Sequence, residues 1–201
     1  GAVLRTDGKL QNASILFEPE TGATTNYVKR HLTPFGEVMP LRSIAEFVSP
    51  LAKNVTDFQA GKTFKIFNVG DARISPIICF EILDDNLIRE GFSKSNLIVA
   101  QTNNATFGDT AQLDQQLNIG KIRAAESSRQ LGYVSTTGTT SFINPDGKIE
   151  SQLVKFTPGT LVGNIDISSG STYAQRYGWL IEPLVIMALL VLMIVRRWGS
   201  Q

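Results

Sequence analysis

The sequence predicts an α/β domain followed by one membrane-spanning helix. Apolar runs typical of buried strands, at residues 74–82 and 96–102, alternate with helical segments at residues 84–91 and 110–131. Strands that alternate with helices are typical of α/β folds. The end of the chain differs in character, because residues 183–195 form an unbroken apolar run.

The N-terminal part of the chain predicts a hairpin and then a short helix. Residues 13–17 have the apolar character of a strand, and residues 17–22 form a turn that ends at Gly22. Residues 41–51 place four apolar side chains at helical spacing: Ile44, Phe47, Val48 and Leu51. The other elements expected before the buried strands are a loop at 34–40, a polar loop at 54–62 and a strand at 63–69.

Capping and turn residues predict the ends of the two helices and the positions of the last strands. Gly91 is expected to end the first buried helix, and Asp109 or Thr110 to cap the second. Arg123 and Glu126 lie three residues apart in that second helix, so we expect them to form an ion pair. A turn at Asn-Pro-Asp-Gly separates the last strands, which are expected at 133–137, 140–143, 148–156 and 161–167.

The C-terminal apolar run is predicted to cross a membrane. Trp179 and Trp198, the two tryptophans of the chain, bracket it, and Arg196 and Arg197 follow it directly. A helix between the tryptophans is roughly 28 Å long, close to the thickness of a bilayer core. Tryptophans at both ends and arginines at the cytoplasmic end are typical of a membrane span. The alternative is a buried helix of a soluble core.

Composition excludes several kinds of function. The chain of 201 residues has a net charge of +1, so its charge gives no argument for nucleic acid. One cysteine and one histidine cannot form a zinc site, and no glycine-rich phosphate loop is present. We therefore expect no metal and no organic cofactor.

Cys79 is the candidate nucleophile. It follows the apolar residues 76–78 and precedes Phe80 and Glu81, which is how a rigid strand delivers a reactive side chain to the edge of a fold. The alternative is that Cys79 is a small buried hydrophobic residue, the commoner role of a free cysteine.

A second motif lies upstream, in the sequence YVKRHLTPFGE of residues 27–37. Its proline and glycine indicate an ordered loop that carries Lys29, His31 and Glu37. A lysine near a cysteine favours the thiolate and can stabilise an oxyanion. A glutamate can hold that lysine in place or move a proton, and His31 is interpreted as a hydrogen-bonding loop residue.

YVKRHLTPFGE followed by PIICFE resembles the nitrilase superfamily of carbon–nitrogen hydrolases, and the HLTPFGE form resembles its apolipoprotein N-acyltransferases. Residues 103–149 are similar to the same family. The resemblance implies an αββα sandwich with Lys29 as the catalytic lysine, Cys79 as the nucleophile, and Glu37 and Glu81 as acidic residues of the site. It also assigns residues 41–51 to a lipid-contacting arm, for which a plain surface helix is the alternative.

The chain departs from the family at three places. Asn104 stands where the family has an acidic residue, and Thr106 stands where it has tryptophan. The general-base glutamate of the family precedes the lysine motif, whereas Glu18 and Glu20 lie in the predicted hairpin turn. We therefore expect a C-terminal fragment, incomplete at its N-terminus and unable to complete catalysis alone.

The expected organisation is a partial catalytic domain at residues 1–167, a linker at 168–178 and a transmembrane helix at 179–198. The resemblance implies transfer of a fatty acyl chain from a membrane phospholipid to the diacylglyceryl-cysteine amine of a bacterial apolipoprotein, through a thioester on the cysteine. The resemblance also implies that the protein is a monomer and that the intact protein crosses the cell (inner) membrane several times. Its catalytic domain is then expected on the extracytoplasmic side and its C-terminus in the cytoplasm. The alternatives are a membrane-tethered nitrilase-type amidase and a non-catalytic membrane-anchored domain.

Overall fold

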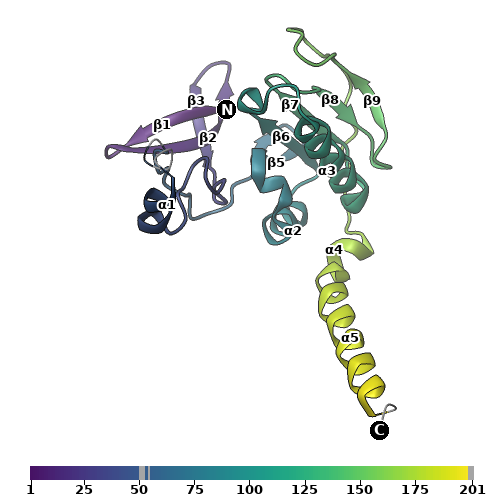
Figure 1. The fold of residues 1–201 in the computed structure, drawn as a ribbon. Helices are drawn as coiled ribbons and strands as arrows, with labels where there is room; N and C mark the ends of the chain where they lie inside the picture. The colour runs from purple at the N-terminus through teal and green to yellow at the C-terminus, as the bar shows by residue number, and fades with distance from the viewer. Residues whose placement is uncertain (50–52, 54, 199–201) are drawn as a thin grey trace.

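The computed structural model describes residues 1–49, 53 and 55–198 and contains two β-sheets with helices between and after them (Figure 1). The first sheet is antiparallel and has the order β1-β2-β3. Its strands are β1 (Ala2–Thr6), β2 (Lys9–Glu18) and β3 (Gly22–Val28). The predicted strand at 13–17 and the hairpin turn after it are confirmed.

The second sheet has six strands in the order β4-β5-β6-β7-β8-β9. Its centre is parallel, from β5 through β6 to β7, and both edges are antiparallel. The strands are β4 (Phe67–Val69), β5 (Ala72–Ile78), β6 (Leu97–Thr102), β7 (Leu131–Ser135), β8 (Ser141–Ile143) and β9 (Ile149–Gln152). The helices α2 (Asp85–Lys94) and α3 (Ala111–Ser127) connect the parallel strands.

Successive side chains of β5 show what packs against each face of the six-stranded sheet. Ile77 belongs to the main core with Ile88 and Phe92 of α2, whereas Ile78 packs in a second cluster with Tyr27 of β3. Successive side chains of a strand point to opposite faces. The six-stranded sheet therefore carries α2 and α3 on one face and meets the three-stranded sheet on the other, which confirms the predicted α/β class with its layered sheets.

Two predicted helix ends were wrong. The helix α2 continues past Gly91 to Lys94, and Gly91 is required for packing instead, since a Cβ atom there would lie 2.5 Å from Ser75 Oγ. The helix α3 ends at Ser127, because Ser128 adopts a left-handed conformation with φ of 50° and Leu131 already belongs to β7.

The predicted ion pair in α3 is confirmed. Arg123 Nη1 lies 2.7 Å from Glu126 Oε2, and Arg123 Nε also donates to the Ile82 carbonyl oxygen at 2.9 Å. A further ion pair joins Arg123 to Asp85. This buried arginine therefore fastens α3 to the turn that follows β5, which is a structural role.

Several predicted strands are shorter or absent. The strand predicted at 63–69 begins only at Phe67, and the one at 74–82 ends at Ile78. Residues 148–156 give only the short β9. Residues 161–167, all within the described part of the chain, form no strand. There, the backbone N–H of Asp166 donates to the side-chain oxygen of Gln130 at 2.7 Å, so a side chain replaces a strand partner.

The helix α1 (Arg42–Val48) forms where a helix was predicted, but it buries no residue. Its apolar side chains Ile44, Phe47 and Val48 are all exposed. Leu51, at the end of that predicted helix, lies outside the described residues.

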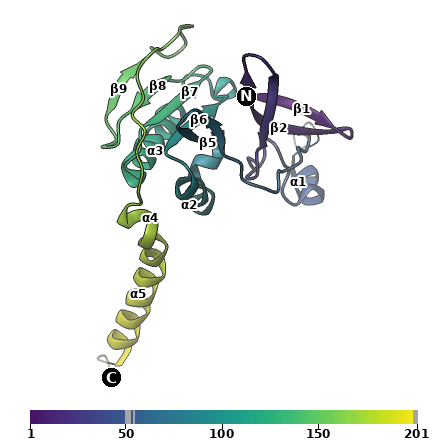
Figure 2. The same cartoon turned by 180° about the vertical axis from the view of Figure 1, so that it is seen from behind.

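The C-terminal helix α5 (Ile181–Trp198) extends away from the domain (Figures 1 and 2). Tyr173–Arg197 is long and apolar enough to cross a membrane. Its most apolar 18-residue stretch has a mean hydropathy of 2.5 and buries no residue in the domain. The side chain of Trp198 lies outside the described residues. The predicted linker is partly helical, since α4 (Tyr173–Tyr177) and a short 3₁₀ turn at Gly178–Leu180 precede α5.

Candidate active site

Cys79 lies at the carboxyl end of β5, where the chain leaves the sheet. It begins a 3₁₀ turn, η2 (Cys79–Leu83), and its side chain is partly exposed. Its φ angle of 52° is in the left-handed region, which costs a residue with a Cβ atom roughly 1–2 kcal/mol. Such strain persists where the surrounding structure holds it and is concentrated at functional sites. The carboxyl edge of parallel strands is also where α/β folds bind their ligands.

Gln116 of α3 is the polar side chain that contacts the sulfur. Its Nε2 atom donates to Cys79 Sγ at 3.7 Å, and its Oε1 atom accepts from Thr102 Oγ1 at 3.1 Å. Sequence reasoning did not single out Gln116. A signal was available, because Leu113, Leu117 and Gln116 lie within one turn of a predicted helix whose apolar side is buried.

Lys29 directly follows β3 and is almost fully buried, with 1% of its side chain exposed. Its Nζ atom lies 2.5 Å from Glu37 Oε2 and 3.0 Å from Thr33 Oγ1. A buried ammonium group requires a paired charge. The motif of residues 27–37 therefore folds back on itself so that its glutamate holds its lysine.

Glu37 is held as a carboxylate. Burial raises its pKa, but hydrogen bonds from Lys29, from the Thr33 backbone N–H at 2.8 Å and from Asn12 Nδ2 at 2.7 Å outweigh burial. The net effect is a pKa below the ordinary value. The Lys29–Glu37 pair is therefore ionic, and each partner stabilises the charge of the other.

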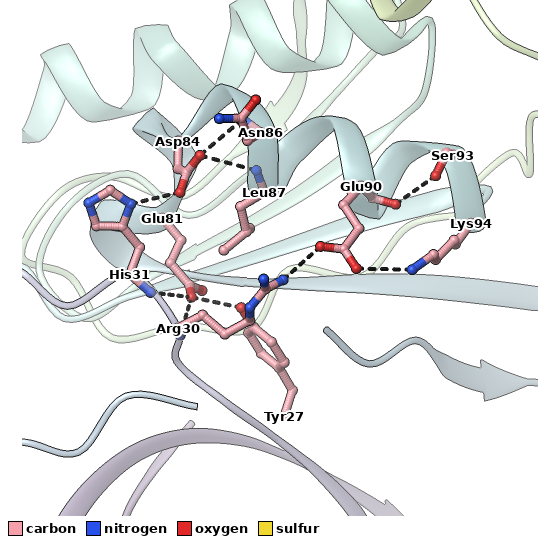
Figure 3. A network of polar contacts seen from close by, with 10 residues as sticks. All are labelled: Tyr27, Arg30, His31, Glu81, Asp84, Asn86, Leu87, Glu90, Ser93 and Lys94. Atoms are coloured by element: carbon pink, nitrogen blue, oxygen red, sulfur yellow. Dashed lines mark hydrogen bonds and ion pairs between the residues drawn. The ribbon is translucent and has the colours of Figure 1, made fainter. Parts of the chain in front are cut away.

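Glu81 is fully buried and joins the lysine motif to the cysteine turn (Figure 3). Its Oε1 atom accepts from Tyr27 OH at 2.7 Å and from the backbone N–H groups of Arg30 at 2.7 Å and His31 at 3.2 Å. Its Oε2 atom accepts from the Ile78 N–H at 2.9 Å. Burial raises the pKa of Glu81, and these hydrogen bonds offset only part of that effect. The carboxyl group thus fixes the start of the lysine loop against the last residue of β5.

Two further polar contacts join these segments near the surface, one a hydrogen bond and one an ion pair (Figure 3). His31 Nδ1 lies 2.7 Å from Asp84 Oδ2, and Arg30 Nη1 lies 2.7 Å from Glu90 Oε2. The interpretation of His31 as a hydrogen-bonding loop residue is confirmed. Among the described residues, no group of His, Cys, Asp and Glu is arranged to hold a metal ion.

The two predicted motifs meet in space. Cys79 packs against the apolar cluster that contains Tyr27 and Ile78, and Tyr27 lies two residues before Lys29. Asn104, one of the departures from the family pattern, is fully buried and receives a hydrogen bond from Thr102 Oγ1. Glu18 and Glu20 are exposed on the β2–β3 hairpin, as the turn prediction expects.

Residues 1–175 match the family model of the carbon–nitrogen hydrolases. The chain belongs to this family. Curated relatives are apolipoprotein N-acyltransferases. The one from Ralstonia nicotianae is 36% identical over 76% of this chain and 30% of its own length. The one from Mycolicibacterium smegmatis is 30% identical over 94% of this chain and 33% of its own length. The chain thus spans about a third of the length of these relatives.

Solved structures share the fold of this chain. An amidase from Nesterenkonia sp. AN1, recorded with an acetamide moiety added covalently at its active-site cysteine, has a TM-score of 0.56 and 17% identity over 75% of this chain and 53% of its own. A glutamine-dependent NAD⁺ synthetase from Acinetobacter baumannii has a TM-score of 0.60 and 15% identity over 78% and 29%. At these identities the likeness concerns the fold alone.

Proposed function

We propose that the protein transfers a fatty acyl chain from a membrane phospholipid to the N-terminal diacylglyceryl-cysteine amine of a bacterial apolipoprotein. The observation that carries this proposal is Cys79, held in a left-handed conformation at the end of a parallel strand, beside a buried lysine motif that Glu81 ties to it. The names of the curated relatives support the acyltransferase reaction.

The chemistry runs in two halves through the sulfur of Cys79. In the first, the thiolate bonds to the carbonyl carbon of a phospholipid ester, the ester C–O bond breaks, and the lysophospholipid oxygen takes the proton that the thiol gave to the general base. In the second, the acceptor amine bonds to the thioester carbon, the C–S bond breaks, and the amine proton returns to the sulfur. The family resemblance assigns the base to a glutamate upstream of Lys29.

The other site residues have distinct roles in this proposal. Lys29 supplies a positive charge that stabilises the tetrahedral oxyanion. Glu37 pairs with Lys29 and holds it in place. Glu81 is a positioning residue, because each hydrogen bond that it accepts comes from the motif of residues 27–37 or from Ile78, the last residue of β5 before Cys79.

The membrane helix fits substrates that stay in the bilayer. The arginines Arg196 and Arg197 end the apolar helix, and the positive-inside rule places that end in the cytoplasm. The domain, at residues 1–167, then lies on the extracytoplasmic side, and residues 179–198 form the span. A domain tethered in this way lies at the membrane surface where both the phospholipid ester and the diacylglyceryl-cysteine amine of the acceptor are found.

The test uses the natural full-length protein in detergent, a phospholipid with a labelled acyl chain, and a synthetic diacylglyceryl-cysteine peptide. The proposal expects labelled N-acyl peptide from the wild type and none from Cys79→Ala. Labelled free fatty acid with no acylated peptide would indicate hydrolysis, as in an amidase-type enzyme. Labelled peptide from Cys79→Ala would refute the assignment of the nucleophile.

A further inference from the structure

Gln116 holds a defined orientation beside the nucleophile. Its Nε2 atom lies 3.7 Å from Cys79 Sγ, and its Oε1 atom lies 3.1 Å from Thr102 Oγ1. The reverse orientation would place the oxygen against the sulfur and the nitrogen against the hydroxyl. Only the observed orientation offers an N–H donor to a thiolate, which accepts hydrogen bonds and donates none.

Buried polar side chains next to Gln116 are joined to one another by hydrogen bonds. Thr102, at the end of β6, is 6% exposed, and Asn104 is 0% exposed. The Asn104 oxygen accepts from Thr102 Oγ1, and its amide nitrogen donates to Ser135 Oγ at 3.3 Å. Thr102 Oγ1 lies within hydrogen-bond distance of both amide oxygens, and its single proton can be donated to only one of them at a time.

The other titratable side chains of the site are Lys29, Glu81 and Tyr133. Lys29 directly follows β3, Glu81 lies in the same turn η2 as Cys79, and Tyr133 lies on β7. Burial raises the pKa of the Tyr133 phenol, and the neighbouring Cys79 raises it further, so the phenol stays neutral at physiological pH. Gln116 differs from all three groups because its N–H donor does not titrate.

We propose that Gln116 is a catalytic residue whose amide N–H stabilises the sulfur anion of Cys79 in both halves of the reaction. It would favour the thiolate as nucleophile in the first half and as leaving group in the second. Thr102 would be a positioning residue that acts through Gln116. This inference rests on the proposed function only in taking Cys79 as the nucleophile.

The test is the rate at which iodoacetamide alkylates Cys79 across a pH range, in the natural full-length protein in detergent. The readout is the mass of the peptide that contains Cys79. The central variant is Gln116→Met, which keeps the length of the side chain and removes the donor. Gln115→Met is the matched control, because Gln115 is exposed one residue earlier on the same helix.

Removal of one hydrogen bond to an anion should move the pH–rate profile of Gln116→Met upward by about one pH unit, since two or three such bonds lower an acid by about two units. A more basic thiolate is also more nucleophilic, with a Brønsted slope of about 0.5. Gln116→Met should therefore react about threefold more slowly than the wild type at low pH and about threefold faster at high pH. A merely structural defect would not make the two profiles cross.

Thr102→Val should shift the profile in the same direction by a smaller amount, and Gln116→His, which retains a ring N–H, should restore part of the wild-type profile. Identical profiles for Gln116→Met and Gln115→Met would overturn the proposal, as would a uniform change of rate at every pH. Alkylation requires no acyl transfer. A crossing of profiles in a protein that forms no N-acyl peptide would therefore uphold Gln116 while the proposed acyltransferase function failed.

Discussion

Replacement of Glu81 by alanine is expected to destabilise the domain, because this carboxyl group accepts four hydrogen bonds in a fully buried place. Two of the donors, Tyr27 OH and the Ile78 N–H, lie in fully buried hydrogen bonds and would be left without a partner. The N–H groups of Arg30 and His31 are only partly buried, so water can reach them in the variant.

The magnitude follows from these donors. A buried donor left unsatisfied costs roughly 1–3 kcal/mol, so two of them predict a loss of about 3 kcal/mol for Glu81→Ala once the relief of carboxylate burial is included. Glu81→Gln keeps an oxygen for Tyr27 and the loop but turns an amide group toward the Ile78 N–H. One lost hydrogen bond predicts a loss of about 1 kcal/mol.

The assay is a urea titration of the full-length protein read by pulse proteolysis of the domain. With a slope of about 2 kcal/mol per molar, the midpoint should fall by about 1.5 M for Glu81→Ala and by about 0.5 M for Glu81→Gln. Glu20→Ala, at an exposed glutamate of the hairpin, is the control and should change little. A midpoint for Glu81→Ala equal to that of Glu20→Ala would refute the claim that Glu81 stabilises the domain by joining the lysine motif to the end of β5. Equal losses for alanine and glutamine would indicate that charge matters and hydrogen bonding does not.

Three further predictions concern the same junction. The pKa of Glu37 lies below its ordinary value of 4.5, so the stability that its carboxylate contributes is present above pH 4.5 and is lost as the pH falls through the lowered pKa. The urea midpoint of Glu37→Gln should therefore depend less on pH in this acidic range than the midpoint of the wild type. Lys29→Met and Glu37→Leu should each cost about 3–5 kcal/mol, and the double variant should cost less than their sum, because each single change leaves a buried charge unpaired; additive losses in a double-mutant cycle would contradict the pairing. Cys79→Gly should be more stable than Cys79→Ala by roughly 1 kcal/mol, because glycine adopts the left-handed conformation freely; equal midpoints would show that the backbone there is unstrained.

Local patterns in the sequence predicted much of the fold. Apolar runs located the buried strands β5 and β6, and helical spacing located α3 and its Arg123–Glu126 pair. The patterns failed where a tertiary contact decides the structure. Gly91 is a common helix terminator, yet here it lets α2 pass close to Ser75 of the sheet. Residues 161–167 were predicted to form a strand, but the backbone N–H of Asp166 donates to the side-chain oxygen of Gln130 in place of a strand neighbour.

The site was predictable in its residue types but not in its connections. Lys29 and Glu37 share one short motif, so their pairing could be expected from the sequence. Three of the four hydrogen bonds of Glu81 join it to residues 50 to 54 positions away in the chain. Gln116 lies 37 residues from Cys79. Contacts over such separations depend on how the sheet and helices stack, which no local pattern reports.

The central claim is that Cys79 carries the acyl group. The most direct measurement is the mass of the Cys79 peptide after the full-length protein is incubated with a phospholipid in the absence of acceptor. The account predicts an added fatty acyl group that hydroxylamine removes, as expected of a thioester, and that disappears when a diacylglyceryl-cysteine peptide is added. An unmodified Cys79 peptide in a preparation that still acylates the acceptor would contradict the account.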